Sequence, residues 1–143
     1  MNRRKAREYA LQFLYRFDFV GSRKNRLKDD SLKAEFRVFM AESGVKDRQA
    51  AEFAEAIIIG TMANIKEIDA ELQKHAQKWK LSRMASIDRN IMRMAAFELL
   101  YRSDIPAAVT INEALEIAKK FSTSESASFI NGLLDSIAKD SDK

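Results

Sequence analysis

The strongest periodic pattern of apolar positions in the chain runs from about Ser86 to Arg102. Apolar residues recur there at steps of three and four, and together they cover most of a helix's circumference. These residues are Ile87, Ile91, Met92, Met94, Ala95, Ala96, Phe97, Leu99 and Tyr101. Only a strip around Arg89 and Arg93 is expected to face solvent. Because a helix that is apolar on nearly every side is normally enclosed by other helices, the pattern predicts the central rod of a helical bundle.

One acidic residue, Glu98, interrupts the apolar stripe of this helix and falls between Ile91 and Met94 in projection. Burying an unpaired carboxylate costs several kcal/mol, so Glu98 is expected to have a partner. We predict a structural acid, hydrogen-bonded either to a basic side chain or to a helix N-terminus near residues 110–112. Catalysis is the less favoured interpretation, because no second acid, histidine or nucleophile has an obvious place beside Glu98.

The same spacing predicts further helices on the N-terminal side of the rod. The first runs from about Arg3 to Val20, and the second runs from about Ser31 to Ser43, where Gly44 is placed to end it. Asp47 is placed to cap a third helix. Residues 21–30 show no periodicity and predict a polar loop. The positions expected to pack are Ala6, Ala10, Phe13, Leu14, Phe17, Val20, Leu32, Phe36, Phe39, Met40, Phe53, Ala54, Ile57 and Ile58.

The helical pattern then continues towards Trp79 with a break near Asn64, so residues 47–78 form either one bent helix or two helices. Beyond the rod, Thr110–Glu113 and Ser122–Glu125 both have the S/T-x-x-E spacing of a capping box, which predicts the starts of two last helices. These run to about Phe121 and Ala138 and are expected to bury Ile111, Leu115, Ala118, Ile130, Leu133, Leu134 and Ile137.

Composition agrees with a single all-helical domain spanning residues 1–143. The chain has one proline and four glycines, and therefore few of the residues that form β-turns. The absence of cysteine excludes disulfides and thiolate metal sites. The single histidine, His75, is expected to be a solvated helix residue. No apolar run reaches the roughly 18 residues of a membrane span and no signal peptide is apparent, so we expect a cytoplasmic protein. We also expect no cofactor and no metal.

Positive charge is concentrated at one end of the chain. Residues up to Lys28 carry nine basic and two acidic side chains, a net +7 within a chain of net +4, so the remainder sums to −3. In the first helix Arg4, Glu8, Gln12 and Tyr15 share the face opposite the apolar one, and Lys5 and Arg16 flank it. Arg3 and Arg7 lie on its border.

Such clustered positive charge is unfavourable at a helix N-terminus, where the macrodipole already places about half a positive charge. Helix stability alone would favour acidic residues here. A phosphate-bearing ligand that offsets the cost is one explanation, and a basic face that is merely solvated is the alternative.

Several blocks of the sequence resemble the NusB family of bacterial transcription antitermination factors. The blocks are RRKAREYALQFLY at residues 3–15, IDRNIMRMAAFEL at 87–99, the Ile105–Pro106 pair, INEALEIAK at 111–119 and SASFINGLLD at 126–135. They occur in the family's order and cover most of the chain outside residues 21–63.

The resemblance implies an all-α, NusB-like bundle of about seven helices in two packed three-helix units, with no enzymatic activity. It further implies binding of boxA-type single-stranded RNA together with NusE, a small-subunit ribosomal protein, within an RNA polymerase antitermination complex. Arg3, Arg4, Lys5 and Arg7 match the family's arginine-rich RNA-contacting motif, and Phe129 matches an aromatic residue that reaches the RNA. Tyr15 and Glu125 match positions associated with contact to the protein partner. Lys5 departs from the arginine that is common in the family, which keeps the charge but loses bidentate geometry.

Three alternatives accompany this interpretation. The first is a helical RNA-binding accessory module of the kind fused to RNA methyltransferases, although the chain has no glycine-rich nucleotide loop. The second is an adapter whose basic first helix lies on anionic lipid. The third concerns Phe129 alone: it projects at the edge of the last helix's apolar stripe, so its ring is either core packing or a stacking surface for an unpaired base.

Overall fold

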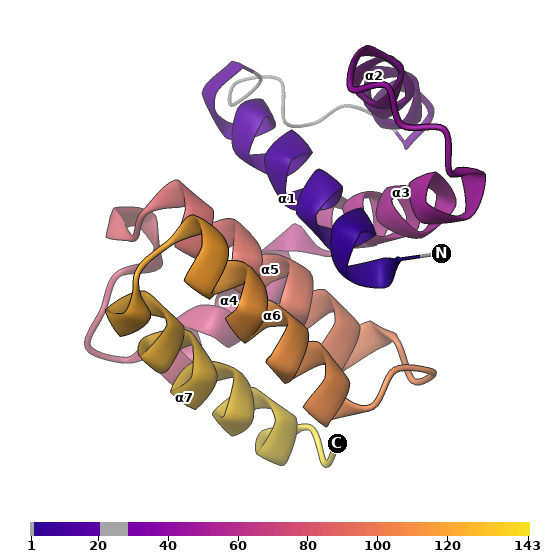
Figure 1. The fold of residues 1–143 in the computed structure, drawn as a ribbon. Helices are drawn as coiled ribbons and strands as arrows, with labels where there is room; N and C mark the ends of the chain where they lie inside the picture. The colour runs from indigo at the N-terminus through magenta and orange to yellow at the C-terminus, as the bar shows by residue number, and fades with distance from the viewer. Residues whose placement is uncertain (1, 21–28) are drawn as a thin grey trace. The chain divides into compact units, whose positions relative to one another are not determined.

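The computed structural model describes residues 2–20 and 29–143, and these residues form α-helices and one short 3-10 helix, with no strand among them (Figure 1). The helices are α1 (Arg3–Val20), α2 (Asp29–Glu42), α3 (Arg48–Ala63), α4 (Ile65–Ala76), η1 (Leu81–Arg83), α5 (Ser86–Tyr101), α6 (Ala107–Phe121) and α7 (Ser124–Asp140). The predicted all-α class is confirmed, and α1 and α5 have the predicted bounds to within one residue. Residues 21–28 of the predicted loop lie outside the described residues. Asp29 and Asp30, which were also assigned to the loop, belong to α2.

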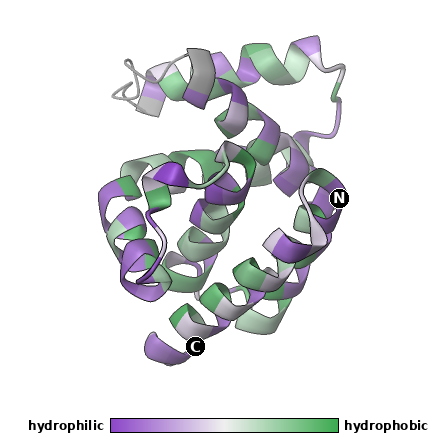
Figure 2. Ribbon diagram, turned by 90° about the vertical axis from the view of Figure 1, so that its left-hand side faces the viewer, coloured by the Kyte–Doolittle hydropathy of each residue, from purple (hydrophilic) through white to green (hydrophobic). Residues whose placement is uncertain are grey.

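The chain divides into two compact units, residues 1–63 and 64–143. The N-terminal unit contains α1, α2 and α3, and the C-terminal unit contains α4 to α7 with η1. Asn64 separates α3 from α4, so the region that the sequence left open consists of two helices. Figure 2 shows green apolar and purple polar stretches alternating along the helices, as expected for helices that bury one face.

The core of the N-terminal unit is built around aromatic rings from α1 and α2. The ring of Phe13 meets Phe36 edge-on at 5.4 Å and Phe39 at 5.6 Å between centroids. Gly44 follows α2 with φ at +73°, the left-handed conformation in which glycine ends a helix. Asp47 caps α3, since its Oδ1 accepts a hydrogen bond from the Ala50 amide at 3.1 Å. Both of these predicted helix boundaries are confirmed.

The centre of the C-terminal unit is α5, which packs against α4, α6 and α7. Its buried residues include Ile91, Met92, Met94, Ala95, Ala96, Phe97, Glu98 and Leu99, so the predicted central rod is confirmed for this unit. The expected solvated strip is wrong. Arg93 forms two hydrogen bonds of 2.8 Å to the carboxylate of Asp69 on α4, and Arg89 donates to the carbonyl of Met84 at 2.9 Å. Arg89 and Arg93 thus bind groups of neighbouring segments instead of facing only solvent.

His75 is also not the solvated residue that the sequence predicted. Its side chain is nearly buried, its Nδ1 is hydrogen-bonded to Ser136 Oγ at 2.6 Å, and its Nε2 lies 3.4 Å from Asp140 Oδ2. Lys74, next to it, donates to the same Asp140 oxygen at 3.1 Å. These contacts join α4 to the end of α7.

Both predicted capping boxes are wrong in detail. Helix α6 begins at Ala107, directly after Pro106, so Thr110 lies inside the helix. Helix α7 is capped by Thr123, one residue later than predicted, and the Thr123 hydroxyl accepts from the amide of Ser126 at 3.0 Å. The inward face of α6 also differs in part from the prediction: Ala114, Ile117 and Ala118 are buried, whereas Ile111 and Leu115 are half-buried.

Among the described residues, no helix is long and apolar enough to cross a membrane.

Candidate nucleic-acid interface

The basic cluster of the N-terminal unit is the first turn of α1. Asn2 caps this helix, because its Oδ1 accepts a hydrogen bond from the Lys5 amide at 3.0 Å. Arg3, Arg4 and Lys5 follow directly, all three are exposed, and the first turn contains no acidic residue. The Asn2 cap was not predicted from the sequence, although an asparagine just before a helical pattern is a recognised start signal.

An aromatic ring on α3 orders two of the arginines. The guanidinium carbon of Arg3 lies 4.7 Å from the centre of the Phe53 ring, and that of Arg7 lies 5.2 Å from it. Cation–π contacts of this kind attract a guanidinium and restrict its motion. The sequence assigned Phe53 to the core, and its second role appears only when α1 and α3 come together.

Arg7 and Glu8 are not surface residues. Arg7 is 3% exposed and Glu8 is 4% exposed, although the sequence placed Glu8 on the open face and Arg7 at its border. Lys5 Nζ lies 3.7 Å from Glu8 Oε1 and 5.4 Å from the Tyr9 ring centre. The Lys5 charge is therefore partly offset by Glu8, and the exposed cations of this turn are Arg3, Arg4 and Lys5. Little of Arg7 is accessible to a phosphate in this conformation.

Phe129 and Glu125 belong to the C-terminal unit, at the start of α7. Phe129 is half-buried beside the fully buried Ile130, and Glu125 is exposed in the first turn. The start of α7 is held to α5 by one carboxylate: Asp88 Oδ1 accepts from the Ser122 hydroxyl at 2.6 Å, and Oδ2 accepts from the Ser126 hydroxyl at 2.8 Å. These two hydrogen bonds hold the first turn of α7, and Phe129 lies in the turn that follows it.

Tyr15, the other predicted partner-contact residue, lies on α1 in the N-terminal unit and is exposed. The predicted residues therefore form two groups. Arg3, Arg4, Lys5, Arg7 and Tyr15 lie on α1, whereas Glu125 and Phe129 lie on α7.

Glu98, on α5 of the C-terminal unit, is a structural acid. It is 1% exposed, and its Oε1 accepts a hydrogen bond from the Thr110 hydroxyl at 2.9 Å. Its backbone carbonyl and that of Arg102 each accept from Lys143 Nζ at 2.8 Å, which places a cation at the C-terminus of α5. Burial lowers the pKa of the Lys143 ammonium, and the nearby Glu98 carboxylate opposes that shift.

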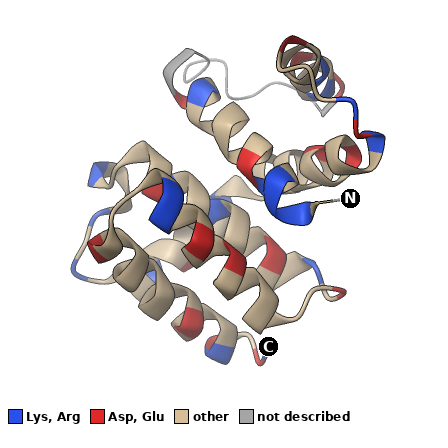
Figure 3. Ribbon diagram, in the orientation of Figure 1, with Lys and Arg blue, Asp and Glu red and all other residues tan. Residues whose placement is uncertain are grey.

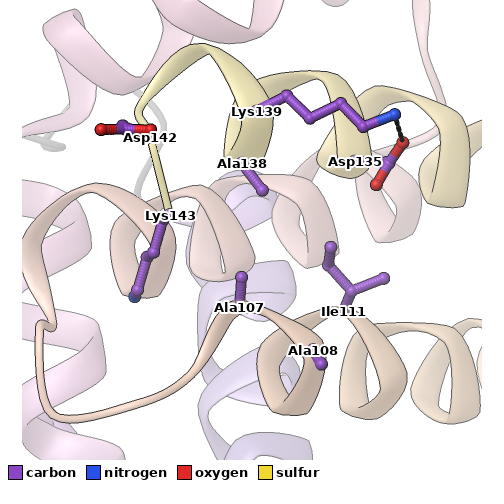
Figure 4. Close-up of a pocket in the computed structure, with 8 residues that line it drawn as sticks. All are labelled: Ala107, Ala108, Ile111, Asp135, Ala138, Lys139, Asp142 and Lys143. Atoms are coloured by element: carbon purple, nitrogen blue, oxygen red, sulfur yellow. Dashed lines mark ion pairs between the residues drawn. The ribbon is translucent and has the colours of Figure 1, made fainter.

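Two other features of the C-terminal unit are structural rather than functional. A shallow hollow of about 460 Å³ lies between α6 and the end of α7, lined by alanines, Ile111 and charged side chains (Figure 4). None of the predicted site residues lines it. Glu71, His75 and Asp140 bring three potential metal-ligating atoms within 4.8 Å of one another. The Lys74 ammonium already supplies a cation there, so we assign this cluster to holding α4 against α7.

The fold and the exposed cations of α1 together define a small all-helical protein with a basic helix start. Sequence comparison identifies its family: the NusB family profile matches residues 4–139, and the chain belongs to this family. The chain is 48% identical over 141 residues to transcription antitermination protein NusB of Thermodesulfovibrio yellowstonii, covering 98% of this chain and 93% of the relative. It is 43% identical over 143 residues to the protein of the same name from Desulforamulus reducens, covering 100% of this chain and 94% of the relative.

Solved structures agree with this assignment. NusB of T. maritima is 37% identical and superimposes with a TM-score of 0.82, covering 97% of this chain and 92% of that chain. A chain in the crystal structure of the antitermination factors NusB and NusE in complex with dsRNA is 26% identical, with a TM-score of 0.81 and 96% coverage of both chains.

Proposed function

We propose that this protein is a transcription antitermination factor that works by binding RNA and is not an enzyme. Relatives that match over nearly their whole length carry the name transcription antitermination protein. The observation on this chain that supports RNA binding is the first turn of α1, where Arg3, Arg4 and Lys5 are exposed and no acidic residue offsets the helix dipole. A phosphate backbone is the ligand that compensates this arrangement, by charge neutralisation and counterion release.

The RNA is proposed to be of the boxA type and to be bound together with a NusE-type ribosomal protein, as part of an RNA polymerase antitermination complex. The similar structure that contains NusB, NusE and dsRNA supports both kinds of partner. Transcription takes place in the bacterial cytoplasm, and we place the protein there.

Each predicted residue has a role within this proposal. Arg3 and Arg4 contact phosphates, and Lys5 adds charge that Glu8 partly offsets. Arg7 is proposed to act from beneath them, by packing on Phe53 and adding positive potential. The half-buried ring of Phe129 stacks on an unpaired base.

Two exposed side chains are proposed to contact the protein partner. Tyr15 on α1 presents an aromatic ring with a hydroxyl group, and Glu125 presents a carboxylate from the first turn of α7. Aromatic residues with a polar end are enriched at protein interfaces. The test is a pair of variants, Tyr15→Ala and Glu125→Gln, which should weaken binding of the NusE-type protein more than binding of RNA alone.

The central experiment is a gel shift with a boxA-like RNA in three forms. These are the single strand, the same sequence as a duplex, and the single strand with a NusE-type protein added. We expect the single strand to bind, because sequence recognition of RNA favours unpaired bases, and we expect the partner to tighten the complex. Absence of a shift in every form, with co-sedimentation on anionic vesicles instead, would replace RNA binding with the lipid interpretation.

A further inference from the structure

The one tryptophan of the chain is an exposed residue. Trp79 lies between α4 and η1, and 61% of its surface is accessible, more than for any other exposed large apolar residue of the described part. Tryptophan is usually largely buried, yet single exposed apolar residues are common and carry no meaning by themselves. The surroundings of Trp79 decide whether its exposure has a function.

The segment that carries Trp79 is held in place. The side chain of Gln73 donates to the Trp79 carbonyl at 2.8 Å and accepts from the Leu81 amide at 2.9 Å, so one amide group spans the turn. The Trp79 amide donates to the Ala76 carbonyl at 3.2 Å. Gln77 has φ at +44°, a left-handed conformation that is costly for a residue other than glycine and that gathers at functional turns. The ring is therefore presented from an ordered turn.

The charged residues that flank Trp79 in the sequence all have one sign. Residues 77–85 read QKWKLSRMA, with Lys78, Lys80 and Arg83 exposed and no acidic residue. An exposed aromatic face between cations is the arrangement that binds single-stranded nucleic acid, in which bases stack on the ring and cations neutralise phosphates. A protein partner would need a larger apolar surface, since stable interfaces bury about 800 Å² on each side. An unpaired, anionic strand is thus the occupant that this surface fits.

Two sets of hydrogen bonds connect the C-terminal part of this segment, through the start of α5, to the start of α7. Arg89 donates to the carbonyls of Leu81 and Met84, which ties the segment to the first turns of α5. Asp88, next to Arg89, binds the hydroxyls that precede and begin α7. The segment, the start of α5 and the start of α7 therefore lie at one end of the C-terminal unit (Figure 1). Figure 3 shows both basic and acidic residues at this end, the acidic ones including Asp88 and Glu125 in the first turns of α5 and α7.

We propose that Trp79, flanked by Lys78 and Lys80, is a second stacking site for an unpaired base of the bound RNA, at the same end of the C-terminal unit as Phe129. This inference rests on the proposed RNA-binding function and adds Trp79 to the residues proposed to contact the RNA. The two rings would engage different bases of one strand, while the lysines neutralise the intervening phosphates.

The presence of a single tryptophan makes the test direct. Intrinsic fluorescence of the intact protein is titrated with boxA-like single-stranded RNA, and binding of the same RNA is followed in parallel by anisotropy of a label on the RNA. We expect quenching that saturates at the Kd obtained by anisotropy. Trp79→Ala should weaken binding about 5- to 150-fold, the range for loss of one stacked base, and Trp79→Phe should retain most of the affinity. The double variant Lys78→Gln/Lys80→Gln should flatten the slope of log affinity against log salt by about 1.4.

Tyr101→Ala is the matched control, because Tyr101 is 44% exposed and lies at the opposite, C-terminal end of α5. It should bind RNA like the unaltered protein. Circular dichroism confirms that each variant is folded.

If anisotropy shows binding while the fluorescence is unchanged, or if Trp79→Ala binds normally, the second stacking site is wrong and the proposed function stands. If quenching follows addition of a NusE-type protein and not of RNA, Trp79 belongs to a protein interface. If no RNA binds at all, the proposed function and this inference both fail.

Discussion

At the scale of single residues, the hydrogen bond between Glu98 and Thr110 shows how a buried charge is accommodated. The two side chains are 1% and 2% exposed, and the hydroxyl donates to the carboxylate at 2.9 Å. A hydrogen bond to a charged group contributes more than one between neutral groups, and removing one partner leaves the other unsatisfied. The pair therefore links α5 to α6 inside the core of the C-terminal unit.

Replacing only one partner of this pair should destabilise the protein more than replacing both. We expect Glu98→Ala to lower the free energy of unfolding by about 2 kcal/mol or more, because it leaves Thr110 unpaired and opens a cavity. The double variant Glu98→Leu/Thr110→Val should lie much closer to the unaltered protein, since apolar groups then replace both partners. Urea unfolding measures each value. Additive losses from the two single variants would show that the pair is not coupled.

Phe129 and Leu133 form a second test at this scale, because they lie one turn apart on α7 and differ in burial. Phe129→Ala should reduce RNA affinity by about 1–3 kcal/mol, the usual value for one stacked base. Its loss of stability should remain well below the roughly 3–5 kcal/mol of a core phenylalanine truncation.

Leu133→Ala is the control for this prediction and should show the reverse pattern. It should lose stability markedly while its folded fraction still binds RNA. RNA titration of both variants, corrected for the folded fraction, separates the two roles. Phe129 is a core residue if its alanine variant melts as readily as Leu133→Ala and binds RNA normally once folded.

At the scale of elements, α1 carries its charges in the order that is unfavourable for a helix. Its first turn contains basic residues and no acidic one, and its last turn contains no basic residue. The Asn2 cap and the Phe53 ring contribute to holding this end in place despite the dipole. Acidic residues in the first turn would make α1 more stable than the basic residues do. Stability given up in this way is typical of a binding surface.

Reversing the charge of one exposed arginine in this turn should therefore move stability and binding in opposite directions. Arg4→Glu should stabilise the protein by about 0.3–1 kcal/mol through the helix dipole. It should also weaken RNA binding and flatten the salt slope by about 0.7, the value for one lost phosphate contact. Thermal melting and anisotropy at several salt concentrations measure the two effects. Arg16→Glu, the same charge change further along α1, should give no stabilisation. An unchanged salt slope for Arg4→Glu would remove Arg4 from the interface.

The junction between α4 and α7 predicts how stability depends on pH. The hydrogen bond from Lys74 and the Lys74 charge lower the pKa of Asp140 below its ordinary value, and the same pair raises the pKa of Lys74. Because the pKa of Asp140 is lower in the folded state, its contribution is present above the unfolded pKa of about 3.9 and is lost as pH falls through the folded value. The contribution of Lys74 is present below about pH 10 and is lost as pH rises further.

Asp140→Asn should thus lower the melting temperature at pH 7 and reduce the additional loss of stability on acidification below about pH 4. The pair is exposed, so both effects should be small. Melting curves between pH 2 and pH 8 provide the measurement. Asp135→Asn is the control, because Asp135 pairs with Lys139 of the same helix at 3.0 Å. Equal acid sensitivity of the Asp140→Asn variant and the unaltered protein would contradict the assignment.

At the scale of the whole molecule, we propose that residues 1–143 act as one RNA-binding domain, although the chain folds into two compact units. The family profile spans both units, from residue 4 to residue 139. If both units contact the same RNA, Arg4→Ala and Phe129→Ala should each weaken the same complex, and the double variant should lose the sum of the two free energies. Anisotropy with one boxA-like RNA measures all three. If only one of the two substitutions affects binding, RNA is bound by one unit alone.

Hydrophobic periodicity by itself determined most of the helices. The bounds of α1 and α5, the stop at Gly44 and the cap at Asp47 follow from spacing and local chemistry, because backbone conformation and capping depend on neighbours in the chain. The basic character of the first turn of α1 also follows directly from the sequence.

Only the tertiary structure decided which polar side chains meet water and which are bound inside the protein. Thr110 fits a capping box locally, yet Pro106 begins α6 earlier and Thr110 binds Glu98 twelve residues before it. Glu8, His75, Arg89 and Arg93 all read as solvated on their own helices and are bound by residues of the same or another segment. Periodicity states only which face of a helix is polar. Whether that face meets water, a ring such as Phe53 or a carboxylate depends on the helix that packs against it, and that helix is distant in sequence.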